Sequence, residues 1–437
     1  MPNVEQRPRV LLIAEAANPE WVSVPLIGWS LSQALLDVAD VHLVTQIRNR
    51  EALLRAGLVE GRDFTAIDSE ALARPLYKIG DRLRGGAGKG WTIIQLANAL
   101  AYPLFERLIW KKFSRSLKAG EWDIVHRITP LSPTISSSLA QKCARIGVPF
   151  ILGPLNGGVP WPKSFDAERR REREWLSYVR SAYQALPGRR RTLRNAAAIL
   201  TGSRHTASEI PKALHDRRVM LPENAVDPSR FTKRAATDGS QLRACFIGRM
   251  VPYKGPDMLI EAAAPLLREG RMHLDMIGDG PLLPELKALA EALQVTQAVT
   301  FHGWLEHRHV QDVAATCSVM ALPSIREFGG GVVVEAMAMG LLPVIVDYAG
   351  PPELVTSDTA VKVPLASREG IVAGFRSALT DLAEAPDTAT RMGTAARARV
   401  EQHLTWAAKA HQIRAVYDWV LGRKPKPILF PELENHS

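Results

Sequence analysis

The sequence predicts an α/β protein with two domains, each built around a parallel β-sheet. The chain has 437 residues, which is more than one hydrophobic core usually organises. Short apolar runs bounded by turn residues alternate with longer helical patterns through both halves, as is typical of consecutive βα units. We therefore expect two Rossmann-like, doubly wound domains.

Apolar runs predict five strands in each half of the chain. In the first half the strands are expected at Val10–Ala16, Val41–Thr45, Asp123–Ile128, Pro149–Gly153 and Ala197–Ser203. In the second half they are expected at Arg243–Gly248, His273–Gly278, Val299–Gly303, Val319–Pro323 and Pro343–Val346. Apolar residues at a helical period predict a last helix over Trp406–Leu421.

A polar segment over residues 224–241 separates the two series of strands. It contains the turn-forming pair Asp227-Pro228 and the polar run Ala235–Ser240, which is the chemistry of a linker. We therefore predict an N-terminal domain over residues 1–226 and a C-terminal domain over residues 227–404.

Composition limits the classes of protein to consider. Hydrophobic residues make up 46% of the chain and charged residues 23%, which is normal for a soluble globular protein. The three cysteines are far apart and form no CxxC pair, so neither a disulfide framework nor a zinc knuckle is indicated, and a cytoplasmic location is expected. No apolar run approaches the ~18 residues of a membrane span, so any membrane contact is expected to be peripheral. The net charge of +10 favours an anionic partner: a nucleotide, a membrane surface or nucleic acid.

The most informative segment for function is Pro323–Ala338. Glu327 is followed by the glycines Gly329, Gly330 and Gly331, then by Val332 and, in an apolar helix, by Glu335. Glycines let the backbone approach a phosphate closely, and a helix N-terminus favours negative charge. The segment predicts a site for a sugar diphosphate, with Glu335 on the ribose hydroxyls and Glu327 facing the sugar. Acids near a helix N-terminus would account for Glu335 alone, but not for the three glycines.

Two further strand-to-helix loops fit the same ligand. Arg249 and Lys254 follow the predicted strand that ends at Gly248, and both could reach a diphosphate, although two solvated loop cations would look the same. Gly278-Asp279-Gly280-Pro281 ends another predicted strand, and it lacks the third glycine of the dinucleotide-binding fingerprint. In isolation it indicates a plain turn.

Together these motifs resemble glycosyltransferase family 4, which comprises retaining enzymes of the GT-B fold that use nucleotide sugars. The resemblance covers most of the second half, including Glu327–Glu335 and Gly350-Pro351-Pro352-Glu353, and continues more weakly in the first half through Gly28, His126, Ser203 and residues 222–227. Two departures stand out. Phe328 precedes the glycines where the family has Glu-Gly-Phe-Gly, and Ala225 replaces a glycine after Asn224.

The resemblance implies a role for each matched residue. Arg249 and Lys254 would bind the donor diphosphate, Glu335 the ribose, and Glu327 with the following amides the transferred sugar. Gly28 and Gly280 would border the donor, and His126 would line the catalytic cleft, although a histidine at a strand end is often only hydrogen bonded. The resemblance further implies that residues 405–437 return to complete the N-terminal domain.

On the acceptor side, the same resemblance points to the N-terminal domain. Asn156, Gly157 and Gly158 form a loop after a predicted strand and are candidates to contact a glycan or lipid-linked glycan. Two basic segments with aromatic residues, Tyr102–Phe113 and Arg169–Arg194, could lie on an anionic membrane surface. For the first, a core-facing helix is an equally good interpretation.

Other motifs are set aside. Gly85–Gly90 resembles a phosphate-binding loop, but Leu83 and Gly90 stand where that loop needs a glycine and a Ser or Thr. His302, His307 and His309 form no metal-binding pattern, so we expect neither a catalytic metal nor a bound cofactor. The prediction is a nucleotide-sugar-dependent glycosyltransferase of envelope or exopolysaccharide synthesis, peripheral on the inner face of the cytoplasmic membrane.

Two alternatives remain open. A nucleotide-sugar epimerase of the same fold would need acid and base residues around the sugar and no acceptor cleft. A basic nucleic-acid-binding protein would need concentrated basic stripes with stacking aromatic residues, whereas the cations near the best motif are few and flanked by glycines. We therefore expect no nucleic-acid partner.

Overall fold

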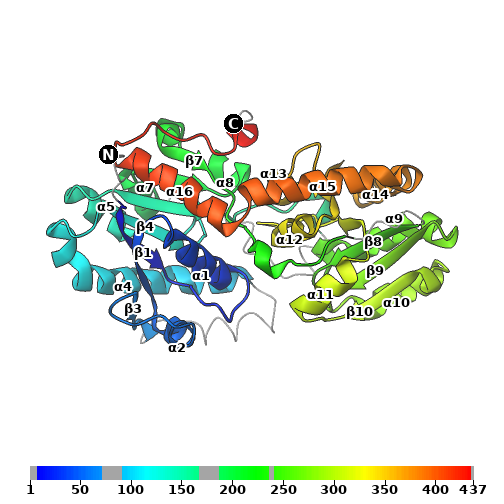
Figure 1. The fold of residues 1–437 in the computed structure, drawn as a ribbon, viewed down its shortest axis with the longest axis horizontal. Helices are drawn as coiled ribbons and strands as arrows, with labels where there is room; N and C mark the ends of the chain where they lie inside the picture. The colour runs from blue at the N-terminus through cyan, green and yellow to red at the C-terminus, as the bar shows by residue number, and fades with distance from the viewer. Residues whose placement is uncertain (1–6, 71–90, 167–186, 236–240, 435–437) are drawn as a thin grey trace. The chain divides into compact units, whose positions relative to one another are not determined.

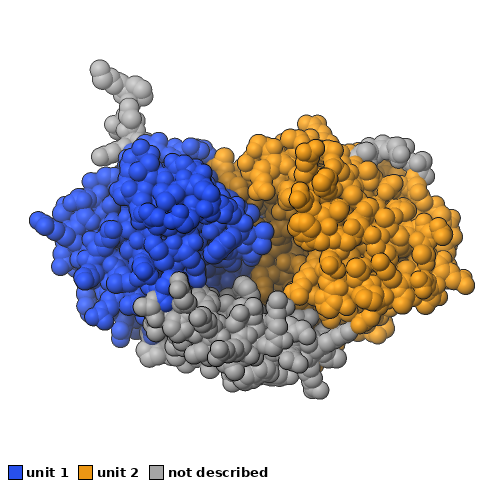
Figure 2. Space-filling model, turned by 90° about the horizontal axis from the view of Figure 1, so that it is seen from below, with its two compact units in different colours: residues 1–158, 170–223, 409–437 blue, residues 159–169, 224–408 orange. Residues whose placement is uncertain are grey.

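The chain folds into two compact units. The computed structural model describes residues 7–70, 91–166, 187–235 and 241–434 (Figure 1). Unit 1 comprises Met1–Gly158, Arg170–Glu223 and Lys409–Ser437, and unit 2 comprises Val159–Arg169 and Asn224–Ala408 (Figure 2). The short stretch that begins at Val159 therefore packs with the second half of the sequence and not with the first.

Unit 1 contains a 7-stranded sheet in the order β3-β2-β1-β4-β5-β6-β7, and every neighbouring pair is parallel. The strands are β1 (Arg9–Ala14), β2 (Asp40–Gln46), β3 (Phe64–Ile67), β4 (Ile124–Thr129), β5 (Phe150–Leu155), β6 (Ala198–Thr201) and β7 (Arg218–Met220). The parallel sheet confirms the predicted fold class. Strands β3 and β7, which have four and three residues, were not predicted.

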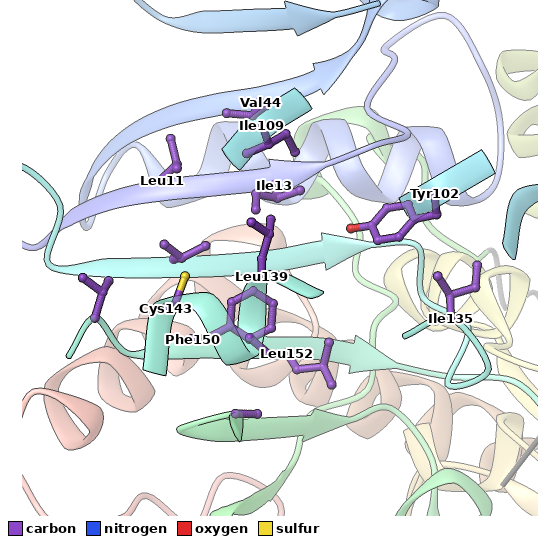
Figure 3. Packing of buried hydrophobic residues seen from close by; sticks show 14 of the residues in the cluster. Leu11, Ile13, Val44, Tyr102, Ile109, Ile135, Leu139, Cys143, Phe150 and Leu152 are labelled. Atoms are coloured by element: carbon purple, nitrogen blue, oxygen red, sulfur yellow. The ribbon is translucent and has the colours of Figure 1, made fainter. Parts of the chain in front are cut away.

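Side chains from the strands and helices of unit 1 form a common core, and the helices that carry residues of this unit follow. They are α1 (Val24–Leu35), α2 (Arg50–Arg55), α4 (Trp91–Lys118), α5 (Ser138–Arg145), α7 (Pro187–Asn195), α8 (Arg204–Ser208), α16 (Trp406–Val420) and α17 (Pro431–Glu434). In Figure 3, Leu11 and Ile13 of β1, Val44 of β2 and Ile109 of α4 lie in one cluster of buried hydrophobic residues. Since Tyr102, Phe105, Ile109 and Phe113 are all buried, the core-facing interpretation of Tyr102–Phe113 holds.

Unit 2 contains a 6-stranded parallel sheet in the order β10-β9-β8-β11-β12-β13. The strands are β8 (Leu242–Ile247), β9 (Met272–Ile277), β10 (Val299–Gly303), β11 (Val319–Leu322), β12 (Leu342–Asp347) and β13 (Val361–Pro364). The helices are α9 (Pro256–Arg268), α10 (Leu283–Ala292), α11 (His307–Ala314), α12 (Gly331–Met339), α13 (Pro351–Leu354), α14 (Arg368–Glu384) and α15 (Pro386–His403). All five strands predicted in this half are present, and only β13 was missed.

The strand order places a switch point in each sheet. In unit 2, β8 lies between β9 and β11, so the chain moves outward in opposite directions from the β8–β11 pair. In open parallel sheets, ligands bind beyond the carboxyl ends of the strands at such a point. The loops after β8 and β11 carry Lys254 and Glu327. The topology therefore brings these two residues to the same end of the sheet, beyond the carboxyl ends of neighbouring strands.

The C-terminal helix α16 contributes to unit 1. The hydroxyl of Tyr417 lies 2.8 Å from Nδ1 of His126 in β4, and Arg414 donates a 2.9 Å hydrogen bond to the carbonyl of Val38. Both Tyr417 and His126 are fully buried. Helix α16 therefore packs into unit 1, as the predicted fold class expects of the C-terminal helix.

Two predicted surface features lie partly or wholly outside the described residues. Gly85–Gly90 lies outside them, as does most of Arg169–Arg194. Within the described part of that basic segment, Arg189 is buried and donates a 2.9 Å hydrogen bond to the carbonyl of Glu209, whereas Arg190 and Arg191 are exposed. Among the helices in the described ranges, none combines the length and apolarity that crossing a membrane needs.

The Tyr417–His126 contact makes a prediction about stability. Burial lowers the pKa of His126 to about 4, so the ring is neutral in the folded protein and needs its hydrogen bonds. Tyr417→Phe removes the partner of Nδ1 and should cost about 1–3 kcal/mol of local stability, because a buried polar atom loses its hydrogen bond. Hydrogen–deuterium exchange of peptides from β4 and α16 measures this cost.

A matched control is available in the same core. The buried hydroxyl of Tyr102 makes no hydrogen bond to any described residue, so Tyr102→Phe should change exchange by far less. Equal exchange changes in both variants would contradict a specific role for the Tyr417 hydroxyl.

Candidate functional site

At the carboxyl ends of β8 and β9, the following loops pack on each other through direct contacts between backbone atoms. The amide of Gly248 donates to the carbonyl of Ile277 (3.0 Å), and the amide of Met250 donates to the carbonyl of Asp279 (2.9 Å). A Cβ at Gly278 would lie 2.0 Å from the Gly248 carbonyl oxygen, and one at Gly280 would lie 2.4 Å from that of Met250. Side chains at these glycines would therefore separate the loops after β8 and β9. Gly280, predicted to border the donor, has at least this packing role.

Lys254 and Glu327 form the central contact of the site. Lys254 ends the 3₁₀ turn η6 (Pro252–Lys254), and Nζ forms an ion pair with a carboxylate oxygen of Glu327. Burial alone would lower the pKa of Lys254, but the adjacent Glu327 carboxylate more than offsets it and the pKa is raised. The lysine is therefore held in its charged form. Arg249, from the same loop, is exposed.

The glycine run after Glu327 opens a helix, as the sequence predicted. Gly330 has a left-handed backbone (φ 63°) and is the N-cap of α12, which starts at Gly331. A Cβ at Gly350 would lie 1.9 Å from the carbonyl oxygen of Phe328, and the Gly350 amide donates to the carbonyl of Glu327 (3.0 Å). The loop after β12 therefore supports the loop that carries Glu327. Helix α12 starts at Gly331, so the amides of Gly331 and Val332 directly follow this loop in the chain.

Glu335 occupies the second turn of α12 and has a different electrostatic setting from Glu327. The side chain is half-buried, and no described residue donates a hydrogen bond to its carboxylate. Burial raises the pKa of Glu335 to about 7, and the charge of Arg230 opposes the rise only in part. Glu335 is thus an acid whose charged form lacks a partner, which suits a group that accepts hydrogen bonds from a ligand.

A stack of aromatic rings around Arg326 was not predicted. The guanidinium carbon of Arg326 lies 4.9 Å from the centroid of the Trp161 ring and 5.0 Å from that of Phe328. Trp161 also meets Tyr253 edge-on at 6.2 Å. The only signal in the sequence was an arginine two residues before a phenylalanine, and Trp161 is too distant in sequence for any pattern to connect it.

His126 and Gly28 belong to the interior of unit 1. His126 lies within β4 between β1 and β5, and Nε2 lies 2.7 Å from the carbonyl oxygen of Gly153 while Nδ1 contacts Tyr417. A Cβ at Gly28 would lie 2.1 Å from the carbonyl oxygen of Ala16, so this glycine lets α1 pack closely on the end of β1. Both nitrogens of His126 are hydrogen bonded and the side chain has no exposed surface, so the structure shows a packing role, and a catalytic role for His126 stays a prediction.

One of the predicted acceptor residues, Asn156, contacts a buried acid that was not assigned a role. Asn156 is buried and donates a 2.7 Å hydrogen bond from Nδ2 to Glu223, while its Oδ1 accepts from the amide of Gly157. Gly157 and Gly158 both have positive φ angles, 135° and 80°. Burial raises the pKa of Glu223 to about 7, although the Asn156 hydrogen bond lowers it. Asn156 thus shapes its loop, and an acceptor role for the loop stays a prediction.

The structure therefore brings some of the predicted site residues together in unit 2. Lys254, Glu327, the glycine run and Glu335 all belong to the carboxyl edge of the unit 2 sheet, with Arg249 and Gly280 on adjoining loops. Gly28, His126 and Asn156 belong to unit 1.

Comparison with known proteins identifies a domain within this chain. Residues 229–399 match the family model described as glycosyl transferases group 1. This match includes Arg249, Lys254, Glu327 and Glu335.

Curated relatives are glycosyltransferases with different substrates. One from Corynebacterium glutamicum, a GDP-mannose-dependent monoacylated alpha-(1-6)-phosphatidylinositol monomannoside mannosyltransferase, is 30% identical over 51% of this chain and 64% of its own length. A D-inositol 3-phosphate glycosyltransferase from Gordonia bronchialis is 33% identical over 38% of each chain. An MMP alpha-(1->4)-mannosyltransferase from Mycolicibacterium hassiacum is 26% identical over 70% of this chain and 72% of its own. The first two matches span less than two thirds of the relatives' lengths.

Solved structures resemble the whole chain in fold. The lipopolysaccharide outer core galactosyltransferase WaaB is 14% identical, with a TM-score of 0.61 over 95% of this chain and 100% of that one. Anabaena HepE in complex with UDP is 16% identical, with a TM-score of 0.60 over 93% of this chain and 98% of that one. These likenesses show a GT-B fold, in which residues 229–399 match the model for glycosyl transferases group 1.

Proposed function

We propose that the protein is a retaining glycosyltransferase of family 4 that moves a sugar from a nucleotide diphosphate to a glycan or lipid-linked glycan of an envelope or exopolysaccharide. The observation that carries this proposal is the Lys254–Glu327 ion pair beside the N-terminal amides of α12, with Glu335 one turn further along. A cation, unpaired amides and a carboxylate in that order match a diphosphate, its sugar and its ribose. The family match over residues 229–399 supports the same assignment.

The proposed reaction exchanges one bond of the sugar for another. The bond between the anomeric carbon and the leaving phosphate oxygen breaks, and the acceptor hydroxyl oxygen bonds to that carbon on the same face. The leaving phosphate oxygen takes the hydroxyl proton, so the proposal needs no protein nucleophile. Arg249 and Lys254 stabilise the charge that grows on the diphosphate, which is usually the largest contribution to catalysis. We assign no part of this stabilisation to a metal ion.

A donor panel tests the proposal directly. The protein is incubated with GDP-mannose, UDP-glucose and other nucleotide sugars, together with a glycan acceptor mixture, and release of the nucleoside diphosphate is measured. We expect release from one donor class, dependent on acceptor and unchanged by EDTA. A sugar that is isomerised while it stays on the nucleotide would instead identify an epimerase.

Lys254→Ala should lower turnover by about 10²–10³-fold, because the growing negative charge on the diphosphate loses its buried cation. The assay is nucleoside diphosphate release with the preferred donor. Lys287→Ala, which removes an exposed lysine of α10, is the matched control and should behave as the native protein does. Near-normal turnover by Lys254→Ala would exclude the assigned role.

Glu335→Gln should change stability and nucleotide binding in opposite directions, with a more stable fold at pH 8 and a weaker affinity for nucleoside diphosphate. Because the folded pKa is raised from 4.5 to about 7, protonated Glu335 stabilises unit 2 below pH 4.5, and this contribution is lost as the pH rises through 7. At pH 8 the free energy of unfolding of Glu335→Gln should therefore be about 1–3 kcal/mol higher than that of the native protein.

The same variant should bind nucleoside diphosphate about tenfold or more weakly, since hydrogen bonds to a charged acceptor contribute ~1.5–3 kcal/mol. Urea unfolding at pH 5 and pH 8 and calorimetric titration measure the two effects, with Glu291→Gln on the exposed face of α10 as control. Unchanged nucleotide affinity would remove Glu335 from the ribose site.

A further inference from the structure

The loop that carries Glu327 is held by a stack of three side chains. The Arg326 guanidinium contacts the rings of both Trp161 and Phe328, with its central carbon 4.9 Å and 5.0 Å from their centroids. Arg326 and Trp161 are 7% and 6% exposed, so the cation is largely removed from water. A desolvated cation–π contact contributes ~2 kcal/mol or more, well above the value of an exposed one. The residues on both sides of Glu327 are thus fixed by one interaction.

The stack is tied to the turn that carries Lys254. The Trp161 ring meets the Tyr253 ring edge-on, and the carbonyl of Tyr253 accepts hydrogen bonds from the Ile325 amide (2.9 Å) and the Ser324 hydroxyl (3.2 Å). Tyr253 directly precedes Lys254, and Arg326 directly precedes Glu327. Glu327 is therefore adjacent in sequence to two members of the stack, and Lys254 is adjacent to Tyr253, which contacts the stack through Trp161.

Trp161 reaches this position from a segment far away in the sequence. The Tyr348 hydroxyl donates a 2.8 Å hydrogen bond to the carbonyl of Pro160, which fixes the backbone beside Trp161. The indole Nε1 of Trp161 is buried and has no hydrogen-bond partner among the described residues. Trp161 is therefore held by its aromatic faces and edges, and a different aromatic ring can do the same work.

We propose that Trp161, Arg326 and Phe328 are positioning residues that fix the Glu327 carboxylate for the transferred sugar. This inference rests on the proposed glycosyltransferase function. The stack fixes the loop before the glycine run, whereas Glu335 lies beyond that run on α12. Loss of the stack thus lowers turnover and alters the choice among donor sugars, while affinity for the nucleoside diphosphate is kept.

The test compares Trp161→Leu, Trp161→Phe and Arg326→Met. Trp161→Leu and Arg326→Met should lower kcat by about 10- to 100-fold, as expected for misplacement of a catalytic group by about 1 Å. Calorimetric Kd for UDP and GDP should stay unchanged. Trp161→Phe should restore kcat, because it keeps a ring and loses no hydrogen bond. Trp110→Leu, which removes a half-buried ring 5.3 Å from Nζ of Lys142 in unit 1, is the matched control.

Two further readouts keep the inference testable whatever the activity. In the double variant Trp161→Leu/Arg326→Met, the combined loss of kcat should be no larger than either single loss, since both changes break one stack. Amide exchange in the peptide spanning Ile325 and Glu327 should accelerate in Trp161→Leu and not in Trp161→Phe. If the native protein transfers no sugar, the proposed function fails, but accelerated exchange still supports the stack. Three results would overturn the positioning role. They are kcat losses that multiply in the double variant, unchanged amide exchange in Trp161→Leu, and a loss of nucleotide affinity as large as the loss of kcat.

Discussion

The neighbouring placement of β8 and β11 is the constraint on which the site depends. Both strands run in parallel through the middle of the unit 2 sheet, and their carboxyl ends meet at the switch point. The loop after β8 supplies Lys254 and the loop after β11 supplies Glu327, and the ion pair closes across them. A different strand order would separate the two side chains even if each loop kept its own conformation.

Glycines make this edge possible because they allow loops to touch through their backbones. Gly278 packs on the Gly248 carbonyl, and Gly350 packs on the Phe328 carbonyl, at distances that leave no room for a Cβ. These two glycines, which lie in loops matched by the family resemblance, therefore have a packing role. Close backbone packing and exposed amides are two consequences of the same missing side chain, so the motif alone could not separate them.

The sequence predicted what depends on local pattern and missed what depends on distant packing. Strands β8 to β12 and the start of α12 follow from apolar runs and the glycine cluster, so they were predictable within a few residues. The burial of His126 was not, because it results from β1, β5 and Tyr417 enclosing one side chain. The Trp161–Arg326 contact likewise joins segments that no local pattern connects. The sequence showed that Phe328 departs from the residue order of the family motif, but it did not show that the Phe328 ring contacts Arg326.

The two glutamates of the motif differ because, among the described residues, only Glu327 forms an ion pair, whereas Arg230 acts on Glu335 without such a contact. Glu327 is paired with Lys254, so a diphosphate that approaches the lysine must compete with a carboxylate already in place. No described residue forms such a pair with Glu335, and burial favours its neutral form up to about pH 7. Hydrogen bonds from ribose hydroxyls would favour its ionised form. If the proposed function holds, binding of a nucleotide sugar would weaken the ion pair of the first carboxylate and supply hydrogen bonds to the second, so that nucleotide recognition and sugar placement would draw on opposite electrostatic changes within a single loop and helix.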